Sequence, residues 1–185
     1  MMMALTLSLT LIPIVPSTDA HADNILAKEY FVKAAFLYNF ARLVEWPSAT
    51  FKTKNTPFRL CFIGSEPFGK ALRSLRNKKV NGHHLIIQRD VTLSDASRCQ
   101  ILFISQSEKN NIADILTTLN HAPVLTVSEV SEFAEQAGHI RLFLAADKKL
   151  SLEVNLDAIN KAGLIISSRI LTLAKIVSSK GTIKP

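Results

Sequence analysis

The chain has 185 residues, of which 48% are hydrophobic and 20% are charged, and its formal net charge is +7 at pH 7. That length suffices for one ordinary domain with a substantial core. The charge suits acidic partners or anionic lipid, but no block of five or more basic residues occurs, and this argues against nucleic-acid binding. No internal repeat, low-complexity segment or second hydrophobic span is visible.

Residues 1–22 predict a cleaved secretory signal peptide. An apolar run from Ala4 to Val15 is followed by a break and then by Ala20-His21-Ala22, the small-x-small pattern that signal peptidase requires. The run is too short to be retained as a transmembrane helix. The stretch before it lacks Lys and Arg, and the alternative is a hydrophobic N-terminus on a cytoplasmic protein. We expect an exported protein whose residues 23–185 form a single α/β domain, working without ATP or NADH.

The two cysteines, Cys61 and Cys99, favour one disulfide, because an even count in an oxidising compartment indicates a pair. Cys61 lies in the apolar run 58–63, and Cys99 directly precedes the run 101–104. The first and third strands of an open α/β sheet are often neighbours, and facing positions on neighbouring strands are within disulfide reach. Two separate buried thiols remain the alternative.

A long helix is predicted from Asn24 to Val44, with Asp23 or Asn24 as its N-cap and Trp46-Pro47 after its end. From Tyr30 to Val44 it is apolar nearly all round, interrupted by Lys33, Asn39 and Arg42. A helix of this composition is either fully buried or shared with a partner.

Strands and helices are then expected to alternate. Short apolar runs predict strands at 58–63, 85–88, 101–104 and 124–127. Helices are predicted after the first, third and fourth of them, capped by Ser65, Ser107 and Ser128. The expected buried faces are Phe68, Ala71, Leu72 and Leu75; Ile112, Ile115, Leu116 and Leu119; and Val130, Phe133, Ala134 and Ala137, the last helix ending at Gly138.

A C-terminal antiparallel hairpin is predicted from 140–144 and 150–156, followed by a last helix over 168–177. The second hairpin strand alternates apolar and polar residues, as a half-buried strand does. Together the elements predict a mostly parallel sheet of five to six strands with helices on both faces.

Gly64 to Lys70 matches the G-x-x-x-x-G-K phosphate-binding loop. Ala71 replaces the hydroxyl residue that would hold Mg²⁺, Glu66 would place negative charge beside the phosphates, and Pro67 removes a backbone N–H. A plain strand-to-helix turn is the better interpretation, and an anionic small ligand at the turn is the weaker one.

No catalytic set, metal site or cofactor site is predicted. His83 and His84 are adjacent on a strand and point to opposite faces, so they cannot chelate one ion together. His121 and His139 lack ligand-type neighbours, and we expect solvated or hydrogen-bonded imidazoles. Ser167-Ser168-Arg169 is better explained by Ser168 as a helix N-cap than by a nucleophile. The chain is therefore expected not to be an enzyme.

A basic ridge on the second predicted helix is the candidate partner-binding surface, and it consists of Lys70, Arg73, Arg76, Lys78 and Lys79. Cations near a helix C-terminus are also favoured by the helix dipole, so a merely solvated face is the alternative. The functional interpretation is docking to an acidic protein surface or to anionic lipid.

Three stretches together resemble a known family. They are residues 33–40 running into Glu45-Trp46-Pro47, the 60–64 strand followed by Pro67-Phe68-Gly69, and residues 154–156 continuing through 162–168 into the closing segment. In this order they are similar to the YfiR family of periplasmic proteins.

The resemblance implies regulation rather than catalysis. Such proteins are dimeric periplasmic repressors that bind the periplasmic sensor region of an inner-membrane diguanylate cyclase, lowering cyclic-di-GMP and biofilm formation. An outer-membrane OmpA-like lipoprotein can sequester them. The family links activity to redox state, and Cys61 and Cys99 match one of its cysteine pairs, while the second pair of some relatives is absent here. The alternative function is a periplasmic small-ligand sensor domain for another signalling protein.

Overall fold

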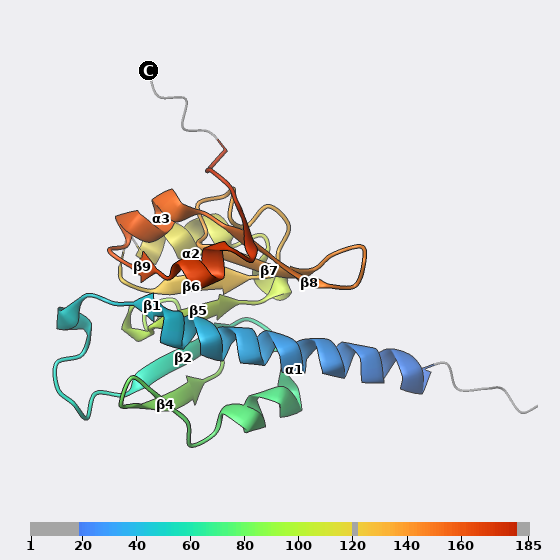
Figure 1. Cartoon of the computed structure of the whole chain (residues 1–185), viewed down its shortest axis with the longest axis horizontal. Helices are drawn as coiled ribbons and strands as arrows, with labels where there is room; N and C mark the ends of the chain where they lie inside the picture. The colour runs from blue at the N-terminus through green and yellow to red at the C-terminus, as the bar shows by residue number, and fades with distance from the viewer. Residues whose placement is uncertain (1–18, 120–121, 181–185) are drawn as a thin grey trace, which may run out of the picture.

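The computed structural model describes residues 19–119 and 122–180, which form a mixed α/β domain around one large sheet (Figure 1). The sheet has eight strands in the order β10-β8-β7-β6-β5-β2-β4-β3. Its strands are β2 (Phe58–Ile63), β3 (Lys79–Val80), β4 (His83–Gln88), β5 (Ile101–Ile104), β6 (Leu125–Ser128), β7 (Ile140–Leu144), β8 (Leu150–Val154) and β10 (Ala174–Ile176). Only the β3–β4 and β7–β8 pairs are antiparallel, so the predicted mostly parallel sheet with a C-terminal hairpin is confirmed.

The central strands are apolar along their length because both of their faces are covered. All four residues of β5 and all four of β6 are buried. In the register, Leu60 of β2 lies beside Ile101 of β5, which lies beside Leu125 of β6. The first and third predicted strands, β2 and β5, are therefore neighbours as expected, in the order β4-β2-β5.

One face of the sheet is covered by α1 (Asp19–Leu43), the 3₁₀ segment η2 (Gly69–Leu75) and the short α4 (Ser168–Leu171). Figure 1 shows α1 lying across the strands, with its first turns extending beyond the sheet. Leu37, Phe40 and Ala41 of α1 are buried in the main core together with Phe58, Phe62 and other strand residues. The predicted first helix is confirmed, although it begins at Asp19 rather than near Asn24.

A second, smaller core lies around α2 (Ile112–Leu119), whose Ile112, Ile115 and Leu119 are buried and whose Leu116 is half-buried. The short 3₁₀ segments η3 (Ala96–Arg98) and η4 (Gln106–Glu108) flank β5. Several short elements had no sequence prediction. Among them are α3 (Leu156–Lys161) and the strands β1 (Val44–Glu45) and β9 (Ile165–Ile166), which form a small antiparallel sheet near η1 (Ser48–Thr50).

The prediction of an α-helix capped by Ser65 is wrong in the helix type and in the first residue of the helix. The segment is a 3₁₀ helix that begins at Gly69, and the Ser65 N–H is bonded to the Ser107 hydroxyl at 2.9 Å. Its expected buried residues, Phe68, Ala71, Leu72 and Leu75, are nevertheless all buried. Ser107 lies in η4 and does not cap α2.

The predicted helix over residues 129–137 is absent, because the segment is a series of turns. Glu132 and Ala137 have φ of 60° and 69°, in the left-handed region that interrupts a right-handed helix. Val130, Phe133 and Ala134 are buried as expected, but Ala137 is exposed. The Ser128 hydroxyl donates to the Ile104 carbonyl and accepts from the Val130 N–H, which ties the turns to β5.

The predicted last helix over 168–177 is also wrong beyond Leu171. Residues Ala174–Ile176 form β10, which pairs in parallel with β8 and so covers an edge of the sheet that would otherwise be open. Ser167, not Ser168, is the N-cap, since its hydroxyl accepts from the Arg169 N–H at 3.3 Å. The hairpin strand likewise ends at Val154, and Asn155 then caps α3.

The predicted signal peptide lies mostly outside the described residues, so its cleavage stays a prediction. None of the helices that the structure describes is both long and apolar enough to cross a bilayer.

Candidate functional site

The structure joins Cys61 of β2 to Cys99, which follows η3, in a disulfide with its Cα atoms 6.0 Å apart. Both residues are buried in the second core, at 0% and 2% exposure. The bridge therefore ties the central strand β2 to the segment that enters β5. Because the sulfurs lie in the core, reduction requires local opening before a reductant can reach them.

The turn after β2 has no free anion site. The Glu66 carboxylate accepts from the Gly69 N–H at 2.9 Å and pairs with Arg89 at 2.6 Å, so the position expected for a ligand anion is occupied by the chain's own carboxylate. Gly64 has a φ of +80°, and a Cβ there would lie 2.7 Å from the Glu108 Cγ. The phosphate-loop interpretation is not supported by this geometry.

All five residues of the predicted basic ridge are exposed, on η2 and on the segment that leads into β3. Within the described ranges, no carboxylate lies within ion-pair distance of Lys70, Arg73, Arg76, Lys78 or Lys79. The Lys78 ammonium and the Arg42 guanidinium lie 5.1 Å and 5.8 Å from the ring centroid of Tyr38. This ridge is therefore a surface of unneutralised positive charge.

A groove of about 330 Å³ lies beside the ridge, between η2 and β4. Its lining contains Arg73 and Arg76 from the ridge, Arg89 from beyond β4, and the apolar side chains of Leu72, Leu85, Ile86 and Ile87. No carboxylate lines it. The groove is therefore lined by both positively charged and apolar side chains.

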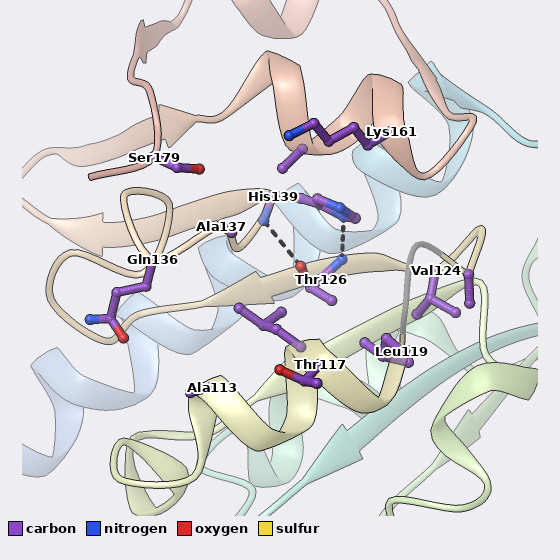
Figure 2. A pocket seen from close by; sticks show the side chains of 13 residues that line it. Ala113, Thr117, Leu119, Val124, Thr126, Gln136, Ala137, His139, Lys161 and Ser179 are labelled. Atoms are coloured by element: carbon purple, nitrogen blue, oxygen red, sulfur yellow. Dashed lines mark hydrogen bonds between the residues drawn. The ribbon is translucent and has the colours of Figure 1, made fainter. Parts of the chain in front are cut away.

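A separate pocket of about 440 Å³ lies between α2 and α3 (Figure 2). Figure 2 shows Ala113 and Thr117 of α2 on one side, Lys161 of α3 on the other, and Thr126 and His139 between them. Its volume is within the range of small-molecule sites, and its lining is mainly apolar with no carboxylate. No sequence pattern indicated this pocket, because its residues come from distant segments.

His139 is held in place at the base of this pocket. The Thr126 N–H donates to His139 Nδ1 at 3.1 Å, and the His139 N–H donates to the Thr126 hydroxyl at 3.0 Å. Because Nδ1 accepts a backbone proton, the neutral imidazole carries its proton on Nε2. The expectation of a hydrogen-bonded histidine is confirmed for His139.

Two other described histidines, His83 and His84, lie next to each other on β4. His83 Nδ1 lies 2.7 Å from the Thr56 carbonyl, and its ring stacks on Phe51 at 4.1 Å, whereas His84 is exposed. His121 lies outside the described residues. In the part of the chain that the structure covers, no group of three or more His, Cys, Asp or Glu side chains could hold a metal ion.

A buried ionic cluster joins α1 to the segment after β6, and the sequence prediction had missed it. Lys33 is 2% exposed and contacts the carboxylates of Glu29 and Glu129. The Tyr30 hydroxyl donates to Glu129 at 3.1 Å. Burial, followed by the nearby Glu129 charge, raises the pKa of Tyr30 above its ordinary value. The one signal in the sequence was a lysine inside an otherwise apolar helical run.

These features define a mixed α/β domain with one core disulfide, an unneutralised basic ridge and a mainly apolar pocket. The chain matches the YfiR/HmsC-like family over residues 30–175, and it belongs to that family.

One solved structure that matches part of the chain is that of a conserved domain protein from Vibrio cholerae O1 biovar El Tor str. N16961. The two share 14% sequence identity with a TM-score of 0.46, over 65% of this chain and 54% of that one. The chain thus spans about half the length of that protein. A search of curated proteins finds no match.

Proposed function

We propose that this protein is a periplasmic repressor of an inner-membrane diguanylate cyclase. It binds the periplasmic sensor region of the cyclase and so lowers cyclic-di-GMP and biofilm formation. An OmpA-like lipoprotein of the outer membrane sequesters it and releases the cyclase. The observation that carries this proposal is membership of the YfiR/HmsC-like family over most of the chain.

The basic ridge supports binding as the mode of action. Five exposed cations without carboxylate partners attract an acidic surface, and they accelerate encounter with it at low ionic strength. We assign the ridge as the contact surface for the partner. Its action requires no catalytic group.

Exposed apolar side chains support self-association into a homodimer. Phe31 and Val32 on α1 are each 48% exposed, and Ile165 and Leu173 are 65% and 67% exposed. Large apolar side chains left in water favour burial against a second protein surface. A two-fold dimer would place the same patch of each copy against its partner.

Co-purification from the native envelope tests the binding proposal. A tagged wild-type protein should retain a membrane cyclase, and Lys78→Glu with Lys79→Glu should reduce the recovered cyclase by about tenfold. Lys54→Glu with Lys109→Glu is the matched control, because both lysines are exposed and lie outside the ridge. Equal recovery with both double variants would reject the ridge as the contact surface.

A second candidate function is a small-ligand sensor, and the pocket between α2 and α3 favours it. Its ligand would have an apolar body and a negative group facing Lys161. Screening aromatic carboxylates by thermal shift tests this function, with Thr117→Trp as the variant that fills the pocket. A melting-temperature increase in the wild type that Thr117→Trp abolishes supports the sensor. An unchanged melting temperature across the screen counts against it.

A further inference from the structure

The outer edge of β4 is only partly covered. The two-residue strand β3 pairs with His83 and His84 alone, through Val80 and Lys79. The turn that joins them is Asn81-Gly82, with φ of 48° and 92°, as in a tight two-residue hairpin. Beyond Leu85, whose N–H donates to the Lys78 carbonyl, β4 continues to Gln88 with β2 on its inner side only.

The backbone direction at this edge follows from one hydrogen bond. The Leu85 N–H donates to the Lys78 carbonyl at 2.9 Å, so the polar backbone groups of Leu85 face the outer side. Successive residues of a strand direct these groups to alternate sides, and those of Ile87 therefore face outward as well. Among the strands that the structure describes, none pairs with β4 at Ile87 on this outer side.

The groove described above runs along this same edge. Leu85, Ile86, Ile87 and Arg89 line it from the strand side, and Arg73 and Arg76 line it from the η2 side. Ile86 is 40% exposed, and neither Arg73 nor Arg76 has an ion-pair partner among the described carboxylates. Arg89, by contrast, is paired with Glu66.

We propose that an extended acidic segment of a protein partner adds to the sheet as a strand along the outer edge of β4. Its backbone bonds to the outward groups of Ile87, apolar side chains on one of its faces cover Ile86, and carboxylates on its other face pair with Arg73 and Arg76. This mode rests on the proposed function, since it specifies how the protein holds its partner.

Charge selects this occupant. A second copy of the same edge would place arginine against arginine, and like charges directly opposite each other across strands are destabilising. An acidic segment removes that repulsion and gains ion pairs at the rim. The arginines also protect the free protein from edge-to-edge aggregation, because charged side chains beside an open strand disfavour its pairing with the open strand of another molecule.

The probe is a fluorescent hexapeptide that alternates glutamate and valine, with a lysine–valine peptide as its charge control. The acidic peptide should bind the full chain at least about tenfold more tightly, with an affinity that falls as salt rises. Two further acidic peptides carry N-methyl groups either on all glutamates or on all valines. One of them should lose binding and the other should keep it, because only one edge of the added strand faces β4. Equal binding by both would overturn the proposal.

Two measurements on the protein complete the test. Arg73→Glu with Arg76→Glu should weaken the acidic peptide about tenfold, whereas Lys54→Glu with Lys109→Glu should leave its affinity unchanged. Amide exchange measured by NMR should slow at Ile87 when the acidic peptide is bound. Unchanged exchange at Ile87 in a saturated complex would show that the peptide binds by charge alone.

The two proposals fail separately. If the acidic peptide binds no better than the lysine peptide while deletion of the protein raises cyclic-di-GMP, the edge proposal is wrong and the regulatory function stands. If the peptide protects Ile87 while deletion leaves cyclic-di-GMP unchanged, the edge is a binding site and the regulatory function is wrong.

Discussion

Lys33 shows how a single polar residue fixes the position of a long apolar helix. An ammonium at 2% exposure is tolerated only when carboxylates neutralise it, and Glu29 and Glu129 do so. Glu129 belongs to the turns after β6, so this contact sets where α1 lies along the sheet. Apolar packing alone would allow α1 to slide by a turn.

Replacing Lys33 with Met should lower the free energy of unfolding by about 3–5 kcal/mol, because two carboxylates would remain partly buried without a cation. Urea unfolding at pH 7 measures this. Lys28→Met on the exposed side of the same helix is the control and should change stability by less than about 0.5 kcal/mol. A similar small change for Lys33→Met would show that the cluster is not neutralised in the way described.

Tyr30 gives the fold a sensitivity to alkaline pH. Its pKa is raised in the folded state, so its contribution to stability is complete below the ordinary phenol pKa of about 10 and is lost as pH rises toward the folded value. In that interval the free energy of unfolding should fall by up to about 1.4 kcal/mol per pH unit from this group.

Tyr30→Phe should be about 1 kcal/mol less stable at pH 7, because the hydrogen bond to Glu129 is lost. Between pH 10 and about 11 it should lose stability less steeply than the wild type, since no phenol must be ionised. Parallel slopes of the two proteins in this range, measured by urea unfolding, would contradict the raised pKa.

At the level of elements, the longer strands could be predicted, whereas the short strands and several connections could not. β2 and β5 are buried on both faces, so their apolar runs alone locate them. The segment 129–137 has helical spacing, but it folds as turns because Phe133 packs against Gly138 and Ser128 is tied to β5. Residues 174–176 form a strand because they pair with the edge of β8. Local sequence does not show such a long-range pairing.

Gly138 tests the account of these turns. A Cβ at this position would lie 2.5 Å from Cζ of the buried Phe133 ring, which has no room to move. Gly138→Ala should therefore destabilise the protein by about 2–3 kcal/mol through overpacking. Gly69→Ala is the contrast, because its φ of +47° is strained but no atom lies within 4 Å, and about 1 kcal/mol is expected. Thermal unfolding of the two variants should rank them in this order, and the reverse order would contradict it.

The disulfide links two elements that are 38 residues apart. Replacing Cys61 and Cys99 together with Ser should lower the free energy of unfolding by about 3–4 kcal/mol on the chain-entropy account. Urea unfolding with and without a phosphine reductant measures it. The reductant should destabilise only the wild type, and titration of two reactive thiols in the purified, unreduced protein would contradict the bridge.

At the scale of the whole molecule, the ridge could be predicted but the cavities could not. Lys70, Arg73 and Arg76 are spaced three residues apart, which keeps them on one side of an α-helix or a 3₁₀ helix. They are therefore all exposed although the segment is a 3₁₀ helix and not the predicted α-helix. The pocket between α2 and α3, and the open edge of β4, depend on strand order and on which segments become neighbours. Neither property is encoded in any short stretch of residues.

The molecule as a whole combines a core that contains a disulfide with a basic surface beside the partly unpaired outer edge of β4. The disulfide joins β2 to the segment before β5, and the Lys33 cluster joins α1 to the turns after β6. This arrangement suits a protein that acts by holding another protein.

The most direct test of the regulatory role is cyclic-di-GMP measured by mass spectrometry in cells that lack the protein. Deletion should raise the nucleotide several-fold, wild-type protein supplied in the periplasm should restore the original level, and Arg73→Glu with Arg76→Glu should restore it incompletely while accumulating to the same amount. An unchanged cyclic-di-GMP level after deletion would contradict the account.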